Sequence, residues 1–432
     1  MKIKIIEKSY PEVMALPTPK HKKPKKINLF FRILIKILSS INLKRNNIKF
    51  NEFGMDKLGK KEPCLILMNH SSFIDLQIAA SYLFPRPFST VCTTDAFVGK
   101  KWLMRQIGCI PTQKFVADIA LLRDMSYAVK ELRSSVLMYP EAGYSFDGTA
   151  TTLPDTLGRL AKMLKVPVVT LITHGAFSRE PLYNMLRHRE VDISADVTYL
   201  FSKEDIETLS ADEINEKIKT AFSFDNFKWQ QDNNIVIDED FRADGLERVL
   251  YKCPHCMSEG SNVGKGTLLT CSVCGKQYEL TELGALRALD GDSAFTHVPD
   301  WYRWEREQVK AELDEGRYLL DTDVDIYMMV DQNAIYHVGA GHLVHNSEGF
   351  HLTGADGALD YSHAPLASYS LNADYYWYEI GDMISIGNSR QLFYCFPTSK
   401  DPIVAKARLA AEELFKIKMK ERRQPKKDRT NN

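Results

Sequence analysis

The chain has 432 residues, of which 44% are hydrophobic and 10% aromatic, so its composition excludes a disordered or fibrous protein. At roughly 150 residues per domain, this length accommodates about three domains. The formal net charge of zero conceals an asymmetry, because residues 1–45 carry +10, residues 416–429 carry +6 and residues 46–415 carry −16. Basic ends on an acidic body predict attachment to an anionic surface, either a membrane or a nucleic acid, through the termini.

Residues 27–43 are the most apolar stretch near the N-terminus. They predict a helix on which Arg32 and Lys36 lie one turn apart, while apolar side chains cover most of the remaining surface. The two charges disfavour a membrane span, and five lysines between residues 20 and 26 precede the helix. The pattern predicts a basic amphipathic helix that lies in the headgroup region of an anionic membrane. The alternative is a helix docked on the protein's own core.

The sequence shows no run of about 18 apolar residues and no cleavable signal peptide. Its eight cysteines comprise two Cys-x-x-Cys pairs and four scattered residues. This usage favours a reducing cytosol and a metal site over a disulfide framework. We therefore expect a cytoplasmic protein that is peripheral on the inner face of the cell membrane.

Residues 60–202 alternate short β-branched runs with helical stretches. Strands are expected at CLILMN, STVCTT, VLMYP and VPVVTLITH, with helices between them. This rhythm predicts an α/β domain with a mixed, largely parallel sheet and flanking helices. Residues 203–250 read as polar helices, and Ser210 with Glu213 fits a capping box at the start of one of them.

From about residue 321 to residue 398 the pattern changes to seven or eight short strands with turn signals, followed by a helix. This spacing predicts a small antiparallel sandwich or barrel, and the closing helix resembles the pleckstrin-homology-like plan. The expected organisation in chain order is a basic amphipathic membrane-associating segment (1–50), the α/β domain (51–250), a cysteine-bearing insert (251–282), a helical connector (283–320), a β-rich domain with its closing helix (321–415) and a basic tail (416–432).

The insert carries two Cys-x-x-Cys pairs, Cys253 with Cys256 and Cys271 with Cys274, with fourteen residues between the pairs. Four thiolates at this spacing predict one tetrahedral structural Zn²⁺ site in a small zinc ribbon. A site closed by four protein ligands has no open position for catalysis. We therefore expect the metal to hold the insert together.

The segment Asn69-His-Ser-Ser-Phe-Ile-Asp75 follows the predicted strand CLILM, at the place where a helix begins. With His70 in the loop and Asp75 in the first helical turn, the carboxylate can accept a hydrogen bond from one imidazole nitrogen. The other nitrogen is then left as a base. The alternative is that Asp75 serves a capping box with Ser72, although this leaves His70 unexplained.

Three further motifs follow this segment in order. Residues 108–114 have a glycine followed six residues later by Lys114, residues 139–145 read Tyr-Pro-Glu-Ala-Gly-Tyr-Ser, and residues 166–168 read Val-Pro-Val. Together with Asn69–Asp75, they resemble the four motifs of the glycerolipid acyltransferase family, which includes 1-acylglycerol-3-phosphate acyltransferase. The resemblance covers roughly residues 60–180.

The resemblance implies transfer of a fatty acyl group from acyl-CoA or acyl carrier protein to a lysolipid hydroxyl, in first place that of 1-acylglycerol-3-phosphate, in phospholipid biosynthesis. His70 would be the general base and Asp75 would orient it; no metal is needed for this step. The substrate-binding residues carried over from the motifs are Asn69, Gly108, Lys114, Pro140, Glu141 and Gly143.

The chain departs from the family pattern at two positions. Lys114 replaces an arginine of the second motif, and Tyr144 stands where the third motif has another arginine. A lysine provides a point charge and not the bidentate fork that an arginine offers to a phosphate. This leaves open a different lysolipid or a phosphate-free alcohol as acceptor. A further alternative is a non-catalytic scaffold whose zinc ribbon and basic tail bind nucleic acid, although the ribbon itself is not basic.

Overall fold

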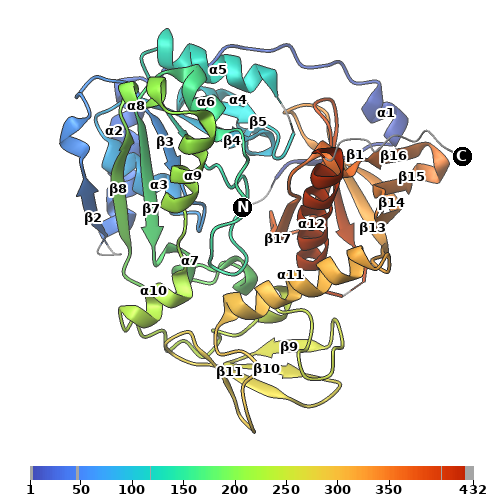
Figure 1. Ribbon diagram of the computed structural model, residues 1–432. Helices are drawn as coiled ribbons and strands as arrows, with labels where there is room; N and C mark the ends of the chain where they lie inside the picture. Colours follow the sequence, from blue (N-terminus) through green and yellow to red (C-terminus); the bar gives the residue numbers. More distant parts are fainter. Residues whose placement is uncertain (1–2, 45–47, 117, 400, 424–432) are drawn as a thin grey trace, which may run out of the picture.

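The computed structural model describes residues 3–44, 48–116, 118–399 and 401–423, which form three sheets with flanking helices (Figure 1). The end of the predicted basic tail, residues 424–432, lies outside the described residues. In chain order the molecule comprises an α/β region, a small cysteine-bearing sheet and a C-terminal sheet with a long helix against it.

A seven-stranded sheet forms the centre of the α/β region. Its strands in chain order are β2 (Lys49–Phe53), β3 (Leu65–Met68), β4 (Phe88–Thr93), β5 (Cys109–Thr112), β6 (Ser135–Met138), β7 (Val168–His174) and β8 (Ser194–Phe201). The spatial order is β2-β8-β7-β3-β6-β4-β5, and β7 and β8 are its one antiparallel pair. In register, Leu65 of the central strand lies opposite Val136 and Val168. The predicted mixed, largely parallel sheet is confirmed.

Helices cover both faces of this sheet. In chain order the helices of this region are α2 (Leu29–Lys44), α3 (Asp75–Leu83), α4 (Lys101–Gln106), α5 (Ile119–Lys130), α6 (Leu157–Leu164), α7 (Ala176–Arg179), α8 (Lys203–Thr208), α9 (Ala211–Ala221) and α10 (Asn226–Asp232), of which α10 lies beyond the end of the sheet, toward the insert (Figure 1). Successive residues of β3 point to opposite faces, so Leu65 and Leu67 join the core under α5, α6 and α9, while Ile66 and Met68 join the core under α3. The capping box of Ser210 and Glu213 is present at the start of α9.

Helix α2 packs against the protein with the side that carries Arg32, Lys36 and the buried Ser39, together with Ile35 and Leu43, which join the core under α3. Its Lys36 ammonium donates to the carbonyl and hydroxyl of Ser81 on α3 (2.9 and 2.8 Å), and its Arg32 guanidinium donates to the Pro85 carbonyl (2.6 Å). The opposite, apolar side is exposed to solvent: Leu29, Phe30, Ile33, Leu34, Ile37, Leu38 and Ile41 are between 38% and 66% exposed. A helix on the surface of a globular protein usually has its apolar face inward and its polar face outward. Most of the apolar side chains of α2 face outward instead.

The cysteine-bearing insert is a four-stranded antiparallel sheet with the order β12-β11-β10-β9. Its strands are β9 (Asn262–Lys265), β10 (Leu268–Cys271), β11 (Gln277–Leu280) and β12 (Leu286–Ala288). Helix α11 (Val298–Asp314) follows and packs against this sheet. The fully buried Trp301 contacts the ring of Tyr278 (5.0 Å between centroids), and its indole N–H donates to the Lys252 carbonyl (3.0 Å).

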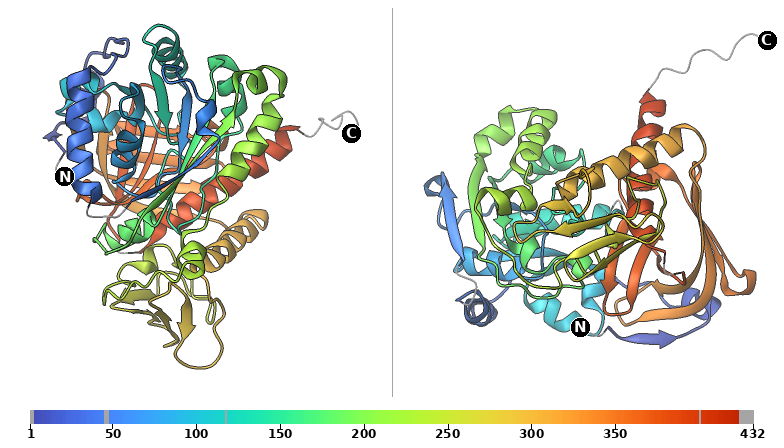
Figure 2. Two further views of the ribbon diagram at one scale, coloured as in Figure 1. Left: turned by 90° about the vertical axis from the view of Figure 1, so that its left-hand side faces the viewer. Right: turned by 90° about the horizontal axis from the view of Figure 1, so that it is seen from below.

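The C-terminal region has seven antiparallel strands: β13 (Leu320–Met329), β14 (Ile335–Asn346), β15 (Gly349–Gly354), β16 (Leu359–His363), β17 (Asn372–Trp377), β18 (Gly381–Gly387) and β19 (Leu392–Pro397). They form one continuous sheet in the order β16-β15-β14-β13-β19-β18-β17. The expected two-sheet sandwich or closed barrel is therefore not formed, because β13 pairs with both β14 and β19 and joins the two halves. The sheet curves around helix α12 (Ile403–Arg423), as Figure 2 shows.

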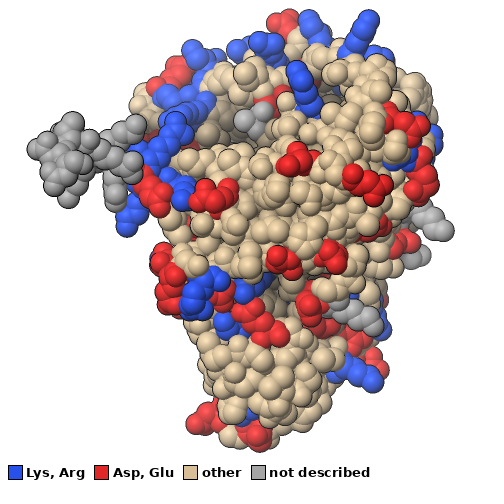
Figure 3. Space-filling model, turned by 90° about the vertical axis from the view of Figure 1, so that its right-hand side faces the viewer, with Lys and Arg blue, Asp and Glu red and all other residues tan. Residues whose placement is uncertain are grey.

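The beginning of the chain belongs to this C-terminal sheet. Strand β1 (Ile5–Glu7) pairs in parallel with β14, with Ile5 opposite Ile335, and the short helix α1 (Tyr10–Met14) follows. The residues that the sequence grouped as 1–50 are thus divided between the C-terminal sheet and the α/β region. Figure 3, which views the side of the molecule remote from α2, shows Asp and Glu side chains scattered over this face and Lys and Arg gathered toward its upper border.

Candidate active site

The sheet brings three of the four sequence motifs together at one edge. Strands β3, β6 and β7 are parallel neighbours, and the first and third motifs follow the carboxyl ends of β3 and β6. The second motif runs through β5, and Lys114 follows this strand at the same edge, two strands away from β6. The fourth motif lies at the opposite edge, at the amino end of β7, where Val168 pairs with Leu65 at the start of β3. Carboxyl ends of parallel strands are where open α/β sheets collect functional groups. His70 with Asp75, Glu141 and Lys114 thus come from three segments at the carboxyl edge of the sheet.

His70 and Asp75 are in hydrogen-bond contact. The Nδ1 atom of His70 lies 3.1 Å from Oδ2 of Asp75, and the same oxygen accepts from the backbone N–H groups of Ser71 (2.8 Å) and Ser72 (3.0 Å). Asp75 therefore both caps the start of α3 and holds the imidazole, so the two interpretations of this residue are compatible. Because a carboxylate only accepts hydrogen bonds, Nδ1 carries the proton in this pair and Nε2 has the free lone pair.

Two tyrosines enclose the imidazole of His70. The ring of Tyr139 lies 4.2 Å from it and that of Tyr144 lies 4.0 Å from it, with interplanar angles of 25° and 30°. Two nearly parallel rings at these distances must occupy opposite faces of the imidazole. Burial lowers the pKa of His70, against the opposing effect of Asp75, and the charge of Lys114 lowers it further. The histidine is therefore neutral near pH 7, the state that a base requires.

Glu141 is fully buried and both of its oxygens are engaged. Oε2 accepts the backbone N–H of His70 (2.8 Å) and Oε1 accepts the backbone N–H of Thr151 (2.8 Å). In return, the His70 carbonyl accepts the N–H of Ser145 (3.2 Å). Burial raises the pKa of Glu141 to about 7 although these N–H groups and the charge of Arg408 oppose the rise. The residue ties the His70 loop to the loop of the third motif.

The other predicted substrate-binding residues are Asn69, Gly108, Pro140 and Gly143, and the structure shows what each of them contacts. The buried Asn69 amide joins β3 to β7 through Thr173, whose N–H donates to Oδ1 (2.8 Å) and whose carbonyl accepts from Nδ2 (3.1 Å). Gly108 has a φ of +84° and lies against the backbone of residue 88. Pro140 is buried, whereas a Cβ on Gly143 would meet no atom within 4 Å. Of these residues, Gly143 is buried and is the one at which an added Cβ would meet open space.

Lys114 has acidic neighbours that the motifs did not indicate. Its charge lowers the pKa values of Asp95 and Asp374, which burial raises; the pKa of Asp374 reaches about 7. Asp95 comes from the segment after β4 and Asp374 from β17 of the C-terminal sheet, and both are at least 91% buried. The cation that was expected to meet a phosphate therefore shares its surroundings with two carboxyl groups.

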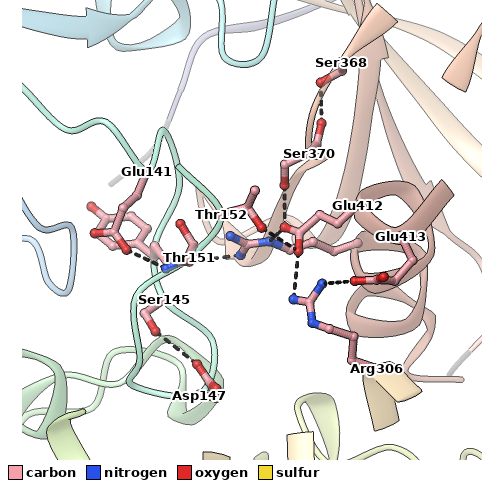
Figure 4. A network of polar contacts seen from close by, with 12 residues as sticks. Glu141, Ser145, Asp147, Thr151, Thr152, Arg306, Ser368, Ser370, Glu412 and Glu413 are labelled. Atoms are coloured by element: carbon pink, nitrogen blue, oxygen red, sulfur yellow. Dashed lines mark hydrogen bonds and ion pairs between the residues drawn. The ribbon is translucent and has the colours of Figure 1, made fainter. Parts of the chain in front are cut away.

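A polar network behind the site was also not indicated by the sequence motifs. Glu412 on α12 accepts from Thr152 (3.1 Å) and Ser370 (2.6 Å), and it is paired with Arg306 of α11 (2.7 Å) (Figure 4). Local sequence gives no signal for these contacts, because their members are separated by between 42 and 260 positions along the chain. The network connects the third-motif loop with the two long helices.

The four cysteines of the insert converge on one point. Their Sγ atoms all lie within 4.8 Å of one another, and the Cys253–Cys274 and Cys256–Cys271 pairs are each 3.7 Å apart. Four sulfurs at about 2.3 Å from a tetrahedral ion would be separated by roughly 3.8 Å. The cluster could thus hold a metal ion, and its residues fit Zn²⁺ in chemistry and in spacing.

Comparison with known proteins places the α/β region in a family. Residues 28–174 match the model of the Acyltransferase family, so this part of the chain is an acyltransferase-family domain and the resemblance seen in the four motifs is confirmed. No curated protein sequence matches the chain. Among solved structures, the chain is similar to the crystal structure of the 1-acyl-sn-glycerophosphate (LPA) acyltransferase PlsC from Thermotoga maritima, with 13% identity over 45% of this chain and 77% of that one and a TM-score of 0.35.

The raised pKa of Asp374 predicts a pH-dependent stability. An unfolded aspartate releases its proton near pH 4, whereas folded Asp374 keeps it until about pH 7, so the folded state loses stability as the pH rises through this window. Asp374→Asn removes this loss with almost no change in shape. We expect the variant to gain about 1–3 kcal/mol relative to the wild type between pH 5 and pH 8, measured by chemical unfolding. Asp232→Asn, at an exposed carboxylate on α10, is the control; an equal change for both variants would contradict the assignment.

Proposed function

We propose that the protein is an O-acyltransferase that transfers a fatty acyl group from acyl-CoA or acyl carrier protein to a lysolipid hydroxyl in phospholipid biosynthesis. The observation that supports it most directly is the His70–Asp75 pair, held at the carboxyl edge of the sheet in a region that matches the acyltransferase family.

The geometry suits a direct transfer. Nε2 of His70 takes the proton of the acceptor hydroxyl as its oxygen attacks the thioester carbonyl; the carbon–sulfur bond then breaks, and the departing thiolate takes the proton from the imidazole. Asp75 stabilises the imidazolium that forms in between. A thioester is reactive enough that positioning and a base suffice, with no covalent enzyme intermediate and no metal in this step.

The acceptor is proposed to be 1-acylglycerol-3-phosphate, because the second motif supplies Lys114 beside His70. One specific observation favours a second candidate, an acceptor without a phosphate. Asp95 and Asp374 lie in the surroundings of Lys114, and Tyr144 occupies a position where the family has an arginine. Carboxyl groups near a single lysine weaken its attraction for a dianionic phosphate. A panel of acceptors decides between the two.

We also propose that the protein binds anionic membranes through α2. The apolar side of α2 faces solvent because the polar side is used against α3, and the exposed Trp102 extends this surface, with its ring 6.3 Å from that of Phe31. No described helix is long and apolar enough to cross a membrane. The contacts of Lys36 with Ser81 and of Arg32 with Pro85 show that α2 runs antiparallel to α3, so its C-terminal end lies toward Asp75 and His70. A bilayer under α2 would thus be close to the base.

The cysteine cluster is proposed to bind one structural Zn²⁺ through Cys253, Cys256, Cys271 and Cys274. The ion would join the two knuckles of the insert, and with four protein ligands it supplies no chemistry to the acyl transfer. Binding of nucleic acid by this insert and the basic tail is the competing function. The described residues, which do not include the end of the tail, give no observation in its favour, and a salt-dependent RNA or DNA retention assay tests it.

The first prediction from the proposed function concerns the base. Incubation of the purified protein with a long-chain acyl-CoA and a panel of lysolipids, including lysophosphatidate and monoacylglycerol, should release free thiol and form a diacyl product. His70→Ala should lower the rate by roughly 10²–10⁴-fold, because proton removal is lost, and should leave the unfolding midpoint nearly unchanged. The same assay with acyl carrier protein in place of acyl-CoA shows which of the two acyl donors the protein uses. Turnover that is unchanged in His70→Ala would remove this residue from the mechanism.

The second prediction concerns membrane binding. Phe30 and Ile37 are 66% and 53% exposed on the outer side of α2, so replacing both by serine should leave the contacts with α3 intact. Loss of two large apolar side chains should weaken binding to phosphatidylglycerol vesicles at least roughly tenfold, measured by vesicle sedimentation. Leu319→Ser, at a position that is 58% exposed before β13, is the matched control. Equal vesicle binding by all three proteins would reject α2 as the membrane contact.

The third prediction concerns the metal. Elemental analysis should find about one zinc per chain, and Cys253→Ser should lose it and unfold at a lower temperature, because metal binding contributes directly to folding. Cys92→Ser, at a cysteine outside the cluster, should keep the ion. A zinc-free wild-type protein whose unfolding midpoint is insensitive to added Zn²⁺ and to chelators would count against the site.

A further inference from the structure

Helix α12 contacts the third-motif loop, although it lies about 260 residues further along the chain. Arg408 donates to the backbone carbonyl of Tyr144 (3.1 Å), and its guanidinium lies over the ring of Phe146 at 4.5 Å from the centroid. Tyr144 is the residue whose ring covers one face of the His70 imidazole. A side chain of the C-terminal region therefore contacts the residue that encloses the base.

Glu412, one turn along α12 from Arg408, holds the other end of the same loop. The carboxylate accepts the Thr152 hydroxyl (3.1 Å) and the Ser370 hydroxyl (2.6 Å), and it is paired with Arg306 (2.7 Å) and Arg408 (3.4 Å) (Figure 4). Although burial raises its pKa, the charges of Arg306 and Arg408 hold the pKa of Glu412 at about 2. Glu412 is thus ionised near neutral pH, and the loop is held between the side chains of Glu412 and Arg408.

The charge of Arg408 also acts on Glu141, the carboxylate that accepts the backbone N–H of His70. Besides Arg408 from α12, the groups that face Glu141 are the N–H groups of His70 and Thr151 and the phenol of Tyr369, which precedes β17. Arg408 is the cation among them. It favours the ionised form of Glu141, the form in which both oxygens accept hydrogen bonds.

We propose that Arg408 and Glu412 of α12 are positioning residues of the acyltransferase site, and that the C-terminal region is a built-in part of this site instead of an independent module. The inference rests on the proposed acyl transfer. It explains why the polar side chains of α12 are buried against a loop of the α/β region: Arg408 and Glu412 are 4% and 1% exposed. Buried charges of this kind are costly unless each has several partners, and here the partners belong to the loop, to α11, to α12 itself and, through Ser370, to the segment before β17.

The test compares four variants. Arg408→Met removes the charge and keeps most of the volume, Arg408→Lys keeps the charge, and Thr152→Val removes a single hydrogen bond to Glu412. Lys406→Met is the matched control, because Lys406 is also a partly buried cation of α12 but pairs with Glu259 (2.7 Å) and Glu312 (2.9 Å), away from the loop. Its loss should lower the unfolding midpoint without touching the site.

We expect Arg408→Met to lower kcat roughly tenfold or more with a smaller effect on KM, because the base is misplaced while the acceptor still binds. Its kcat should also begin to fall at a higher pH on the acid side than in the wild type, since Glu141 is protonated more readily without the neighbouring charge. Arg408→Lys should restore the acid side of the profile, Thr152→Val should lower kcat to a smaller degree, and Lys406→Met should match the wild type in both.

A second readout needs no turnover. The rate at which diethyl pyrocarbonate modifies His70, measured by mass spectrometry of the peptide, should rise severalfold in Arg408→Met as the tyrosines open, and should stay unchanged in Lys406→Met. If the wild type shows no His70-dependent transfer with any donor or acceptor, the proposed function fails, and the labelling still decides the positioning role. A folded Arg408→Met variant with the wild-type pH profile and labelling rate would overturn the proposal; if this variant does not fold, a wild-type kcat and labelling rate in Thr152→Val would do so.

Discussion

The arrangement of the site depends on one buried carboxylate. Glu141 has no exposed surface, and it accepts one backbone N–H from the His70 loop and one from the third-motif loop. A buried carboxylate is unfavourable unless both oxygens are used, so each of the two loops must keep its position for the other to be stable. The pairing of His70 with Asp75, and the stacking of Tyr139 and Tyr144 on the imidazole, follow from this constraint.

The region around Lys114 shows how the C-terminal sheet changes the character of the site. A lysine near the carboxyl groups of Asp95 and Asp374 presents a weaker field to a phosphate than an isolated cation does once these carboxyl groups are ionised, which for Asp374 requires a pH above about 7. One of these carboxyl groups comes from β17, outside the residues that match the acyltransferase family. The proposed selectivity for the acceptor is therefore a joint property of two regions, as is the proposed positioning of the base by α12.

Helix α2 places an exposed apolar surface near the site. Its polar residues are used against α3, the helix whose first residue is Asp75, and its apolar residues face outward. The same helix–helix contact thus exposes an apolar surface and sets its distance from the His70–Asp75 pair. On the far side of the molecule, Asp and Glu side chains are scattered over the surface and Lys and Arg gather toward the upper border (Figure 3).

The local features of the protein could be predicted from its sequence. Periodicity predicted the mixed sheet and the capping box of α9, the Cys-x-x-Cys spacing predicted the cluster of four thiols, and the four motifs predicted the family and the meeting of His70 with Asp75. Each of these depends on residues a few positions apart or on a known order of motifs, so spacing alone carries the information.

Tertiary structure decided what depends on distant segments. The strands of residues 320–397 could have formed a sandwich or a barrel, and the pairing of β13 with both β14 and β19 made them one sheet. The helical pattern of residues 29–44 did not show which side would face the protein, because Ser81 and Pro85 supply the hydrogen bonds that turn its polar side inward. Arg408, Glu412 and Asp374 join the site only through packing across more than 200 residues of chain, and no local pattern marks such contacts.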